Sequence, residues 1–212
     1  MSTAPLSPVE ERGRIHAHLM TFGFLVCLPL GVLIARYFRT FTRRWWFGHT
    51  LVQFLVSGPI IIAGWVLGHQ TTSETLTGHY DDPHKRIGLA LLILYLVQLI
   101  VGLTIHYFKT PSLFGGQRPP QNYFHAIFGL VIIALASYQV HLGMFHEWAF
   151  TFGNTHPVHP GCKHFWLGCT TTFFGLYGIG LVLLRRQYQQ EAVARNKMLN
   201  GDANGSGTAL KA

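Results

Sequence analysis

Two segments in the middle of the chain repeat one spacing of histidine, glycine and glutamine. Each reads His-x3-Gly-x9-Gln-x3-Gly, and the residues in these positions are His84, Gly88, Gln98 and Gly102, then His125, Gly129, Gln139 and Gly143. Because an α-helix has about 3.6 residues per turn, these positions fall on nearly one face of a helix. That face carries an imidazole, which is a common metal ligand, together with small residues that leave room for a large flat group. Haem is the candidate that best fits this combination.

The composition indicates that these faces lie on helices within a membrane. The chain has 212 residues, of which 49% are hydrophobic and only 11% are charged. A helix of about 20 apolar residues crosses a hydrocarbon core about 30 Å thick. Five such stretches occur, near residues 16–36, 48–68, 87–107, 125–145 and 165–184. We therefore predict an all-α membrane protein with five transmembrane helices, four forming an up-down-up-down di-haem bundle and a peripheral fifth.

The polar segments at the two ends of the sequence suggest three parts. We predict a polar N-terminal tail over 1–15, a transmembrane domain over 16–184, and a polar, partly disordered cytoplasmic tail over 185–212. The N-terminal tail lacks the apolar region of a cleavable signal peptide, so the first span is expected to act as the anchor. Pro29 and Pro59 interrupt the first two spans, which buried transmembrane helices tolerate.

The placement of lysine and arginine predicts the orientation. The end of the bundle that holds the amino terminus is called end A. The opposite end is called end B. Five spans bring the following basic residues to end B: Arg36, Arg39, Arg43, Arg44, Lys109, Arg118, Arg185 and Arg186. The positive-inside rule then places end B in the cytoplasm and the N-terminus outside it. This distribution also explains the net charge of +8 without nucleic-acid binding, because no separate basic domain is present in the sequence.

Four histidines stand at the beginning of four successive spans. They are His16, His49, His84 and His125. Successive spans run in opposite directions, so His16 and His84 are expected at end A, and His49 and His125 at end B. Spans one and three are diagonal in an up-down-up-down bundle, as are spans two and four. Each diagonal pair can therefore present two imidazoles across the core, as axial ligands of one haem iron.

Other interpretations of these histidines remain open at this point. A single intramembrane histidine can simply hydrogen-bond between helices, although four in two level pairs are harder to obtain by chance. A histidine-lined proton or metal transporter without haem is a further class, but the five spans contain no acidic residue to assist it. His18 is a reserve ligand for His16. We expect each ligand to donate its second nitrogen to a carbonyl or polar side chain, and Gln53 is one neighbour considered for His49.

The spans resemble the cytochrome b561 family, in the branch of DOMON-associated, ferric-chelate-reductase-like proteins. The matching pieces are HAHLM and PLGVLIARYF in span one, WWFGHTLVQ in span two, DPHKRIG and LVQLIVG in span three, and YFHAIFG and YQVHLG in span four. The likeness covers about residues 16–145. It implies the ligand pairs His16/His84 and His49/His125, and we expect Gly88 and Gly129 to pack against haem. Two features depart from this branch: five spans are counted where six are typical, and no preceding DOMON domain is present in the sequence.

The resemblance also implies a function. It predicts one-electron transfer across the membrane through two haem b groups, from cytoplasmic ascorbate to an extracytoplasmic acceptor such as ferric or cupric ion or monodehydroascorbate. Ascorbate-dependent ferric reductase activity would be one form of it. The alternative is a haem-bearing membrane anchor that relays electrons for a partner redox protein, including a DOMON-type partner on another chain. The family often forms homodimers, and the sequence leaves the oligomeric state open.

Two loops carry further candidate residues. At end B, an anionic donor would meet Arg39, Arg43, Arg44, Lys109 and Arg118. Of these, Arg43, Arg44 and Arg118 are the candidates for contacts to a haem propionate or to the donor, although the positive-inside rule alone also accounts for them. At end A, the stretch HPVHPGCKH contains His156, His159, Cys162 and His164, and we consider its histidines, with the nearby thiol, as a site for an acceptor metal ion. Its spacing matches no standard zinc signature, and a loop of interfacial histidines is the alternative.

Overall fold

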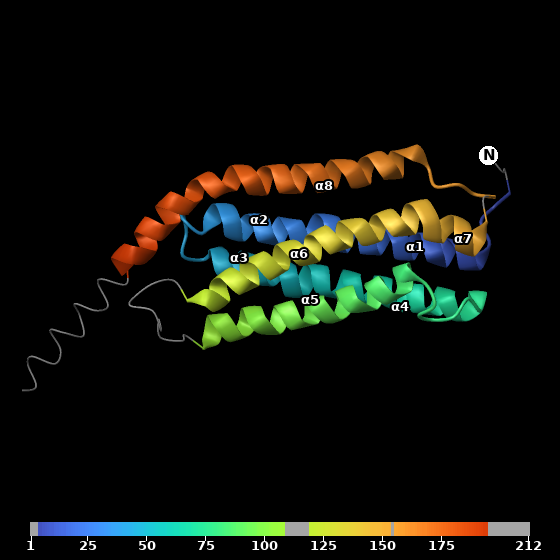
Figure 1. Cartoon of the computed structure of the whole chain (residues 1–212), viewed down its shortest axis with the longest axis horizontal. Coiled ribbons are helices and arrows are strands. Elements are labelled where there is room, and N and C mark those ends of the chain that lie inside the picture. Colours follow the sequence, from blue (N-terminus) through green and yellow to red (C-terminus); the bar gives the residue numbers. More distant parts are fainter. Residues whose placement is uncertain (1–3, 109–118, 154, 195–212) are drawn as a thin grey trace, which may run out of the picture.

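The computed structural model of the chain describes residues 4–108, 119–153 and 155–194. This described part contains five helices long and apolar enough to cross a membrane. Figure 1 shows the long helices lying lengthwise beside one another. They are Pro8–Phe38, Trp45–Thr75, Pro83–Tyr107, Pro120–Phe152 and Pro160–Ala194. The predicted all-helical fold with five candidate spans is confirmed.

Four of the five long helices change their hydrogen-bonding pattern along their length. The first consists of α1 (Pro8–Phe22), the π-helical turn η1 (Gly23–Cys27) and α2 (Leu28–Phe38). The second consists of α3 (Trp45–Leu51), the π-helical turn η2 (Val52–Ser57) and α4 (Gly58–Thr75). The third is α5 (Pro83–Tyr107), and the fourth is α6 (Pro120–Leu142), η3 (Gly143–Glu147) and α7 (Trp148–Phe152). The fifth is α8 (Pro160–Gly180), the short 3₁₀ turn η4 (Leu181–Leu183) and a helical segment over 184–194.

The helices extend beyond the predicted apolar stretches because polar residues cap them. α1 begins at Pro8, within the segment predicted as a tail. There the hydroxyl of Ser7 accepts from the backbone N–H of Glu10, and the Glu10 carboxylate accepts from the backbone N–H of Ser7. This reciprocal capping box satisfies donors that a helix start leaves open. Asp82 caps α5 by accepting from the backbone N–H of Lys85. At the other end of the chain, helix continues to residue 194, past the predicted boundary at 184.

The π-helical turns in the first two spans stand immediately before the two prolines. Pro29 follows η1 and Pro59 follows η2, each as the second residue of the α-helix after the turn. A proline has no N–H to donate, and its ring collides with the carbonyl four residues earlier. A turn widened by one residue relieves that collision and inserts one extra residue into the helix. Each span therefore continues past its proline as one long helix.

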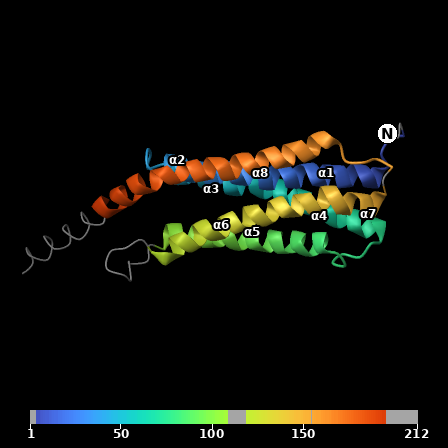
Figure 2. The same cartoon turned by 45° about the horizontal axis from the view of Figure 1, so that its top comes forward.

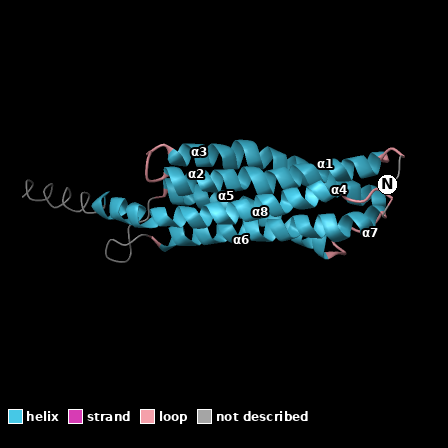
Figure 3. Ribbon diagram, turned by 90° about the horizontal axis from the view of Figure 1, so that it is seen from above, coloured by secondary structure: helices cyan, strands magenta, loops and turns pink. Residues whose placement is uncertain are grey.

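The spans pack as two antiparallel pairs with the fifth helix outside them (Figures 2 and 3). α1 packs along α4, and α5 packs along α6, while α8 lies against α2 and α6. A layer of buried side chains fills the middle of the bundle: Phe24, Leu28, Ile61, Leu91, Tyr95, Ile132 and Ala136. The space nearer each end is left for polar side chains, and the predicted ligands lie there.

Candidate functional site

The four histidines at the span starts form two close pairs. The ring centroids of His16 and His84 lie 6.3 Å apart at end A, with the ring planes 81° to each other. The centroids of His49 and His125 also lie 6.3 Å apart at end B, with the planes at 82°. The pairs are those expected from chain direction. The first span reaches both pairs, since it carries His16 at end A and Gly31, whose carbonyl contacts His49, at end B. With a rise of about 1.5 Å per residue, the two pairs lie about 20 Å apart along the bundle.

His16 is held at end A by the second span. Its Nδ1 lies 2.6 Å from the carbonyl oxygen of Gly64, so Nδ1–H donates there and Nε2 remains available. One turn further along α4, a Cβ atom on Gly68 would lie 2.6 Å from the His16 ring. A glycine at this position therefore leaves the space that the imidazole occupies.

His84, the other member of the pair, is held by the fourth span. The side-chain amide nitrogen of Gln139 donates to the carbonyl oxygen of His84 at 2.6 Å and lies 3.0 Å from its Nδ1. A Cβ on Gly143 would lie 3.1 Å from the His84 ring, and one on Gly88 would lie 3.2 Å from the Gln139 amide. The glycines of both segments thus let the glutamine and the imidazole approach each other.

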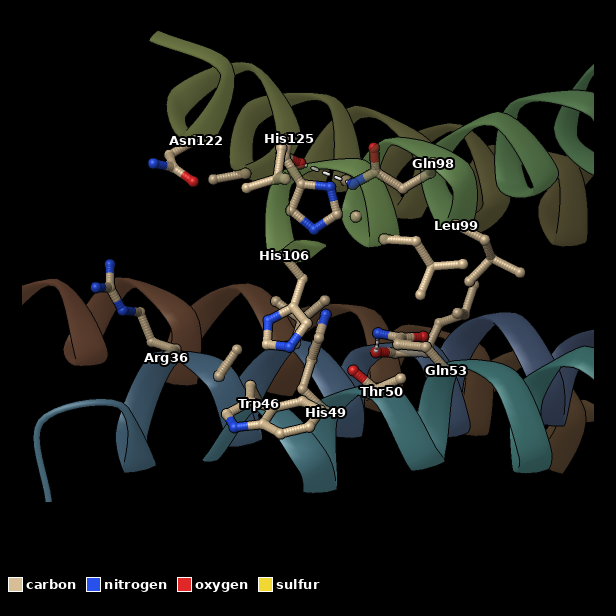
Figure 4. A pocket seen from close by; sticks show the side chains of 18 of the residues that line it. Arg36, Trp46, His49, Thr50, Gln53, Gln98, Leu99, His106, Asn122 and His125 are labelled. Atoms are coloured by element: carbon tan, nitrogen blue, oxygen red, sulfur yellow. Dashed lines mark hydrogen bonds between the residues drawn. The ribbon is translucent and has the colours of Figure 1, made fainter. Parts of the chain in front are cut away.

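The end-B pair, drawn in Figure 4, repeats this arrangement except that Nδ1 of His125 has no hydrogen-bond partner among the described residues. Nδ1 of His49 lies 2.8 Å from the carbonyl oxygen of Gly31, to which it donates. The amide of Gln98 donates to the carbonyl oxygen of His125 at 2.7 Å, and a Cβ on Gly102 would lie 3.0 Å from the His125 ring. Each repeated segment therefore supplies a histidine at one end of the bundle. At the other end, its glutamine and second glycine contact the histidine of the other repeated segment.

The first two spans use the same arrangement with one extra residue. In α5 and α6, the glutamine and the second glycine follow the histidine at fixed offsets. In the second span Gly64 and Gly68 take these two places, and each lies one position further from its histidine, His49. Gly31 likewise stands one position further from His16 than Gln98 does from His84. The π-helical turns η1 and η2 lie within these longer intervals, whereas the fully described α5 and α6 hold no such turn before the second glycine. The extra residue of each π turn therefore keeps the contact residues on the face that holds the histidines.

Each pair opens into a cavity. The end-A cavity has a volume of about 1060 Å³ and is lined by His16 and His84 together with Gly68, Gly88 and Gly143. The end-B cavity is smaller, about 440 Å³, and is lined by His49 and His125 together with Gly102 and Gly129. Gly88 and Gly129, predicted to pack against a flat group, thus line one cavity each.

The spacing within each pair suits a metal ion bound between the two rings. A metal–imidazole bond of about 2.0–2.1 Å, with the ring centroid about 1 Å behind its nitrogen, separates two ligating rings by about 6 Å. The observed separation of 6.3 Å in both pairs agrees with this. Nδ1 of His16 and of His49 is engaged by a carbonyl, which leaves Nε2 for a metal. The residues therefore fit a bis-imidazole haem at each level.

Two side chains considered as alternatives take other roles. His18 is exposed, and its Nδ1 donates to the carbonyl oxygen of Arg14 one turn earlier, so the structure pairs His16 with His84. The Gln53 amide donates to the carbonyl oxygen of Leu28 rather than to His49. Gln53 thus lines the same cavity as His49, but the Gly31 carbonyl and not Gln53 contacts the His49 ring nitrogen.

The arginines at end B divide into exposed ones and ones that line the cavity. Arg43 and Arg44 are exposed in the loop before α3 and are absent from the described residues that line the end-B cavity. Arg118 lies outside the described residues. The cavity is lined by Arg39, which the sequence analysis also named as a contact for an anionic donor, and by Arg36, which it counted only as part of the positive charge of this end. Their position one turn apart at the end of span one was the available signal.

The histidine-rich loop at end A is not gathered around one point. His156 bonds the Glu10 carboxylate through Nδ1 at 2.9 Å and the Ala4 carbonyl through Nε2 at 3.0 Å. The bond to Glu10 raises the pKa of His156, which favours the protonated ring that cannot ligate metal. His159 caps α8 and accepts from the N–H of Gly161, while His164 is exposed. No group of three or more His, Cys, Asp or Glu residues within the described ranges could hold a metal ion.

Comparison with known proteins agrees with the geometry. Residues 15–151 match the family described as eukaryotic cytochrome b561, which is well over half of the chain. The chain belongs to the cytochrome b561 family. Its membership implies haem-mediated electron transfer across a membrane, and the family carries b-type haems.

The relatives that the chain matches are longer proteins. Three cytochrome b561 and DOMON domain-containing proteins of Arabidopsis thaliana are 23%, 27% and 31% identical to it, over 68%, 60% and 63% of this chain respectively. These matches cover only 37%, 30% and 32% of those relatives. The chain thus spans about a third of their length. No solved structure matches it at a significant level.

Proposed function

We propose that this cytochrome b561 chain carries single electrons across the membrane through two haem b groups, one at each imidazole pair. The observation that carries the proposal is the repetition of one ligand arrangement at both ends of a single bundle, with 6.3 Å between ring centroids in each. Haem b, when bound, supplies a one-electron iron couple. In the proposal, His16 and His84 are the axial ligands at end A, and His49 and His125 those at end B.

The chain's own residues define what each site experiences. Carbonyl oxygens orient the rings of His16 and His49, and the Gln139 amide contacts the ring of His84. The buried layer around Phe24 and Tyr95 separates the two cavities and keeps water from the middle of the bundle. Low polarity and fixed hydrogen bonds are the means by which a protein sets the potential of a bound haem. The arrangement is therefore suited to holding electrons at two depths.

We propose that end B faces the cytoplasm, because arginines crowd the span ends on that side. Ascorbate is the proposed donor there, losing one electron and one proton to become monodehydroascorbate. The proposed acceptor outside is a ferric or cupric ion, reduced by one electron, or monodehydroascorbate itself. The dispersed contacts of His156, His159 and His164 do not support a preformed acceptor metal site in that loop.

The decisive experiment is a reduced-minus-oxidised spectrum of the purified protein with its haem content measured. We expect two b-type haems per chain, reduced by ascorbate in two steps. A preparation without a Soret band, from cells well supplied with haem, would contradict the proposal. Haems that dithionite reduces but ascorbate does not would contradict only the choice of donor.

A second function is favoured by the relatives, whose names include a DOMON domain and of which the chain spans about a third. In this alternative the bundle is a haem-bearing anchor that relays electrons for a partner redox protein. It predicts that a partner flavoprotein or a quinol restores haem reduction where ascorbate alone fails.

Gln139 offers a test of how the ligands are supported. Leucine in place of Gln139 removes the amide that contacts both the carbonyl and the ring of His84. Loss of such an outer partner weakens metal binding by about 10- to 100-fold, so we expect faster loss of the end-A haem to apomyoglobin. Gln98→Leu is the matched variant and should affect the end-B haem. Equal haem loss from the wild type and both variants would show that the glutamines only pack helices.

A further inference from the structure

The last helical turns of the chain form part of the end-B cavity, although they lie outside the residues that match the family. Gln187, in the segment predicted as a polar tail, is only 2% exposed and lines the cavity with Arg36. Nη2 of Arg36 donates to the side-chain oxygen of Gln187 at 2.6 Å. The amide nitrogen of Gln187 donates to the Glu191 carboxylate at 2.9 Å. Two polar side chains of the fifth span thus take part in hydrogen bonds at this end of the bundle.

Glu191 also forms an ion pair with the second cavity arginine. Nη2 of Arg39 lies 3.0 Å from the Glu191 carboxylate, and both side chains are partly buried, 28% and 20% exposed. The carboxylate therefore lies within one network with both guanidinium groups, directly through Arg39 and through Gln187 to Arg36. Further contacts fix the same helical segment: the Gln190 amide donates to the carbonyl oxygen of Thr40.

This network lies next to the end-B ligands. The guanidinium of Arg39 lies over the ring of Trp45, 4.9 Å from its centroid. The Trp45 ring in turn lies 6.4 Å from the ring of His49. Arg39 and Trp45 both line the cavity that contains His49, so a molecule bound at Arg39 lies one indole ring from a ligand.

Charge decides which molecules this position favours. Two guanidinium groups attract an anion, and Arg36 still has a buried Nε without a partner among the described residues. The Glu191 carboxylate offsets that attraction and repels an incoming anion, at a distance where partial burial limits screening by salt. A neutral molecule experiences neither effect to a comparable extent.

We propose that Glu191, positioned by Gln187, sets the charge selectivity of the end-B cavity by weakening the binding of anionic donors relative to neutral ones. The proposal rests on the proposed function, in which end B receives the donor. It assigns to the fifth span a role in donor choice.

The test compares an anionic with a neutral reductant in the full-length haem-loaded protein. The initial rate of haem reduction is measured against concentration of ascorbate and of trimethylhydroquinone, and the two KM values are expressed as a ratio. In Glu191→Gln we expect the KM for ascorbate to fall about three- to fivefold while that for the hydroquinone stays constant. In Gln187→Glu, which adds a second carboxylate, the KM for ascorbate should rise by a similar factor. Glu74→Gln is the matched control, because it breaks an ion pair, with Arg12, at end A.

The opposite signs of the two variants separate selectivity from damage. Simple loosening of the helical segment would move both reductants together and in the same direction in both variants, and that result would overturn the proposal. An unchanged ratio in Glu191→Gln, with normal reduction of the wild type by ascorbate, would overturn it and leave the proposed function intact. If dithionite reduced the haems of the wild type and the variants but ascorbate did not, that result would contradict both ascorbate as the donor and this inference.

Discussion

Alanine in place of His84 should remove one haem and leave the other, and alanine in place of His49 should remove the other one. The two rings belong to separate pairs at opposite ends of the bundle. Loss of one imidazole leaves the iron with a single protein ligand and opens a void beside it. Because each single variant disrupts one level only, the haem content should fall to about half of the wild-type value. Pyridine haemochrome analysis of the purified variants measures it.

Double variants test the pairing itself. His16→Ala combined with His84→Ala should lose no more haem than either single change, because both residues serve one site. His16→Ala combined with His49→Ala should lose both haems. His18→Ala is the control at the level of His16, and it should retain full content because, among the described residues, that ring bonds the Arg14 carbonyl of its own helix. Unchanged haem content in both His49→Ala and His84→Ala would show that the ligands are assigned wrongly.

Valine in place of Gly68 should eliminate the end-A haem almost as completely as loss of a ligand. A Cβ at this position would lie 2.6 Å from two atoms of the His16 ring. The ring cannot move aside without breaking its bond to the Gly64 carbonyl. Overpacking of this kind costs about 1–3 kcal/mol, and here the strain falls on the ligand itself. We expect a spectrum with only the end-B haem, at the same level of folded protein in the membrane.

The chain offers matched controls for this prediction. Gly102→Val places the new side chain against His125, where a Cβ would lie 3.0 Å away, and should affect the end-B haem instead. Gly175→Val introduces the same residue into α8 at a position where no described neighbour lies within 4 Å, so it should retain both haems. If Gly68→Val retained a normal end-A spectrum, the close contact between Gly68 and His16 would not exist in the folded protein.

The local spacing of residues predicts part of this arrangement. The identical offsets in α5 and α6 place histidine, glutamine and glycine on one helix face whatever the surroundings, because helix geometry depends only on the backbone. Alternating span direction then assigns each histidine to an end. The pairs His16/His84 and His49/His125 therefore follow from counting residues and crossings. The same count fails in the first two spans, where the contacts are one residue further along. Pro29 and Pro59 were the visible signal, but the position of the π turns depends on how each helix packs.

The placement of charged residues shows what local spacing does not predict. Lysine and arginine near span ends indicate an orientation, since that rule concerns the membrane as a whole. Which arginine lines a cavity depends on neighbours far away in the chain. Arg36 and Arg39 of the first span lie there because Gln187 and Glu191 of the fifth span hold their guanidinium groups. Arg43 and Arg44, close in sequence to His49, lie elsewhere and are exposed.

The sequence alone therefore determined the helical class, the number of spans and the four paired histidines, because periodicity and hydrophobicity act within each helix. Only the tertiary structure decided which carbonyls and amides hold those rings, that the His156 loop does not gather a metal site, and that the fifth span helps to form the end-B cavity. Such contacts join residues on different helices. They depend on how the helices rotate and pack, and no single stretch of sequence records that.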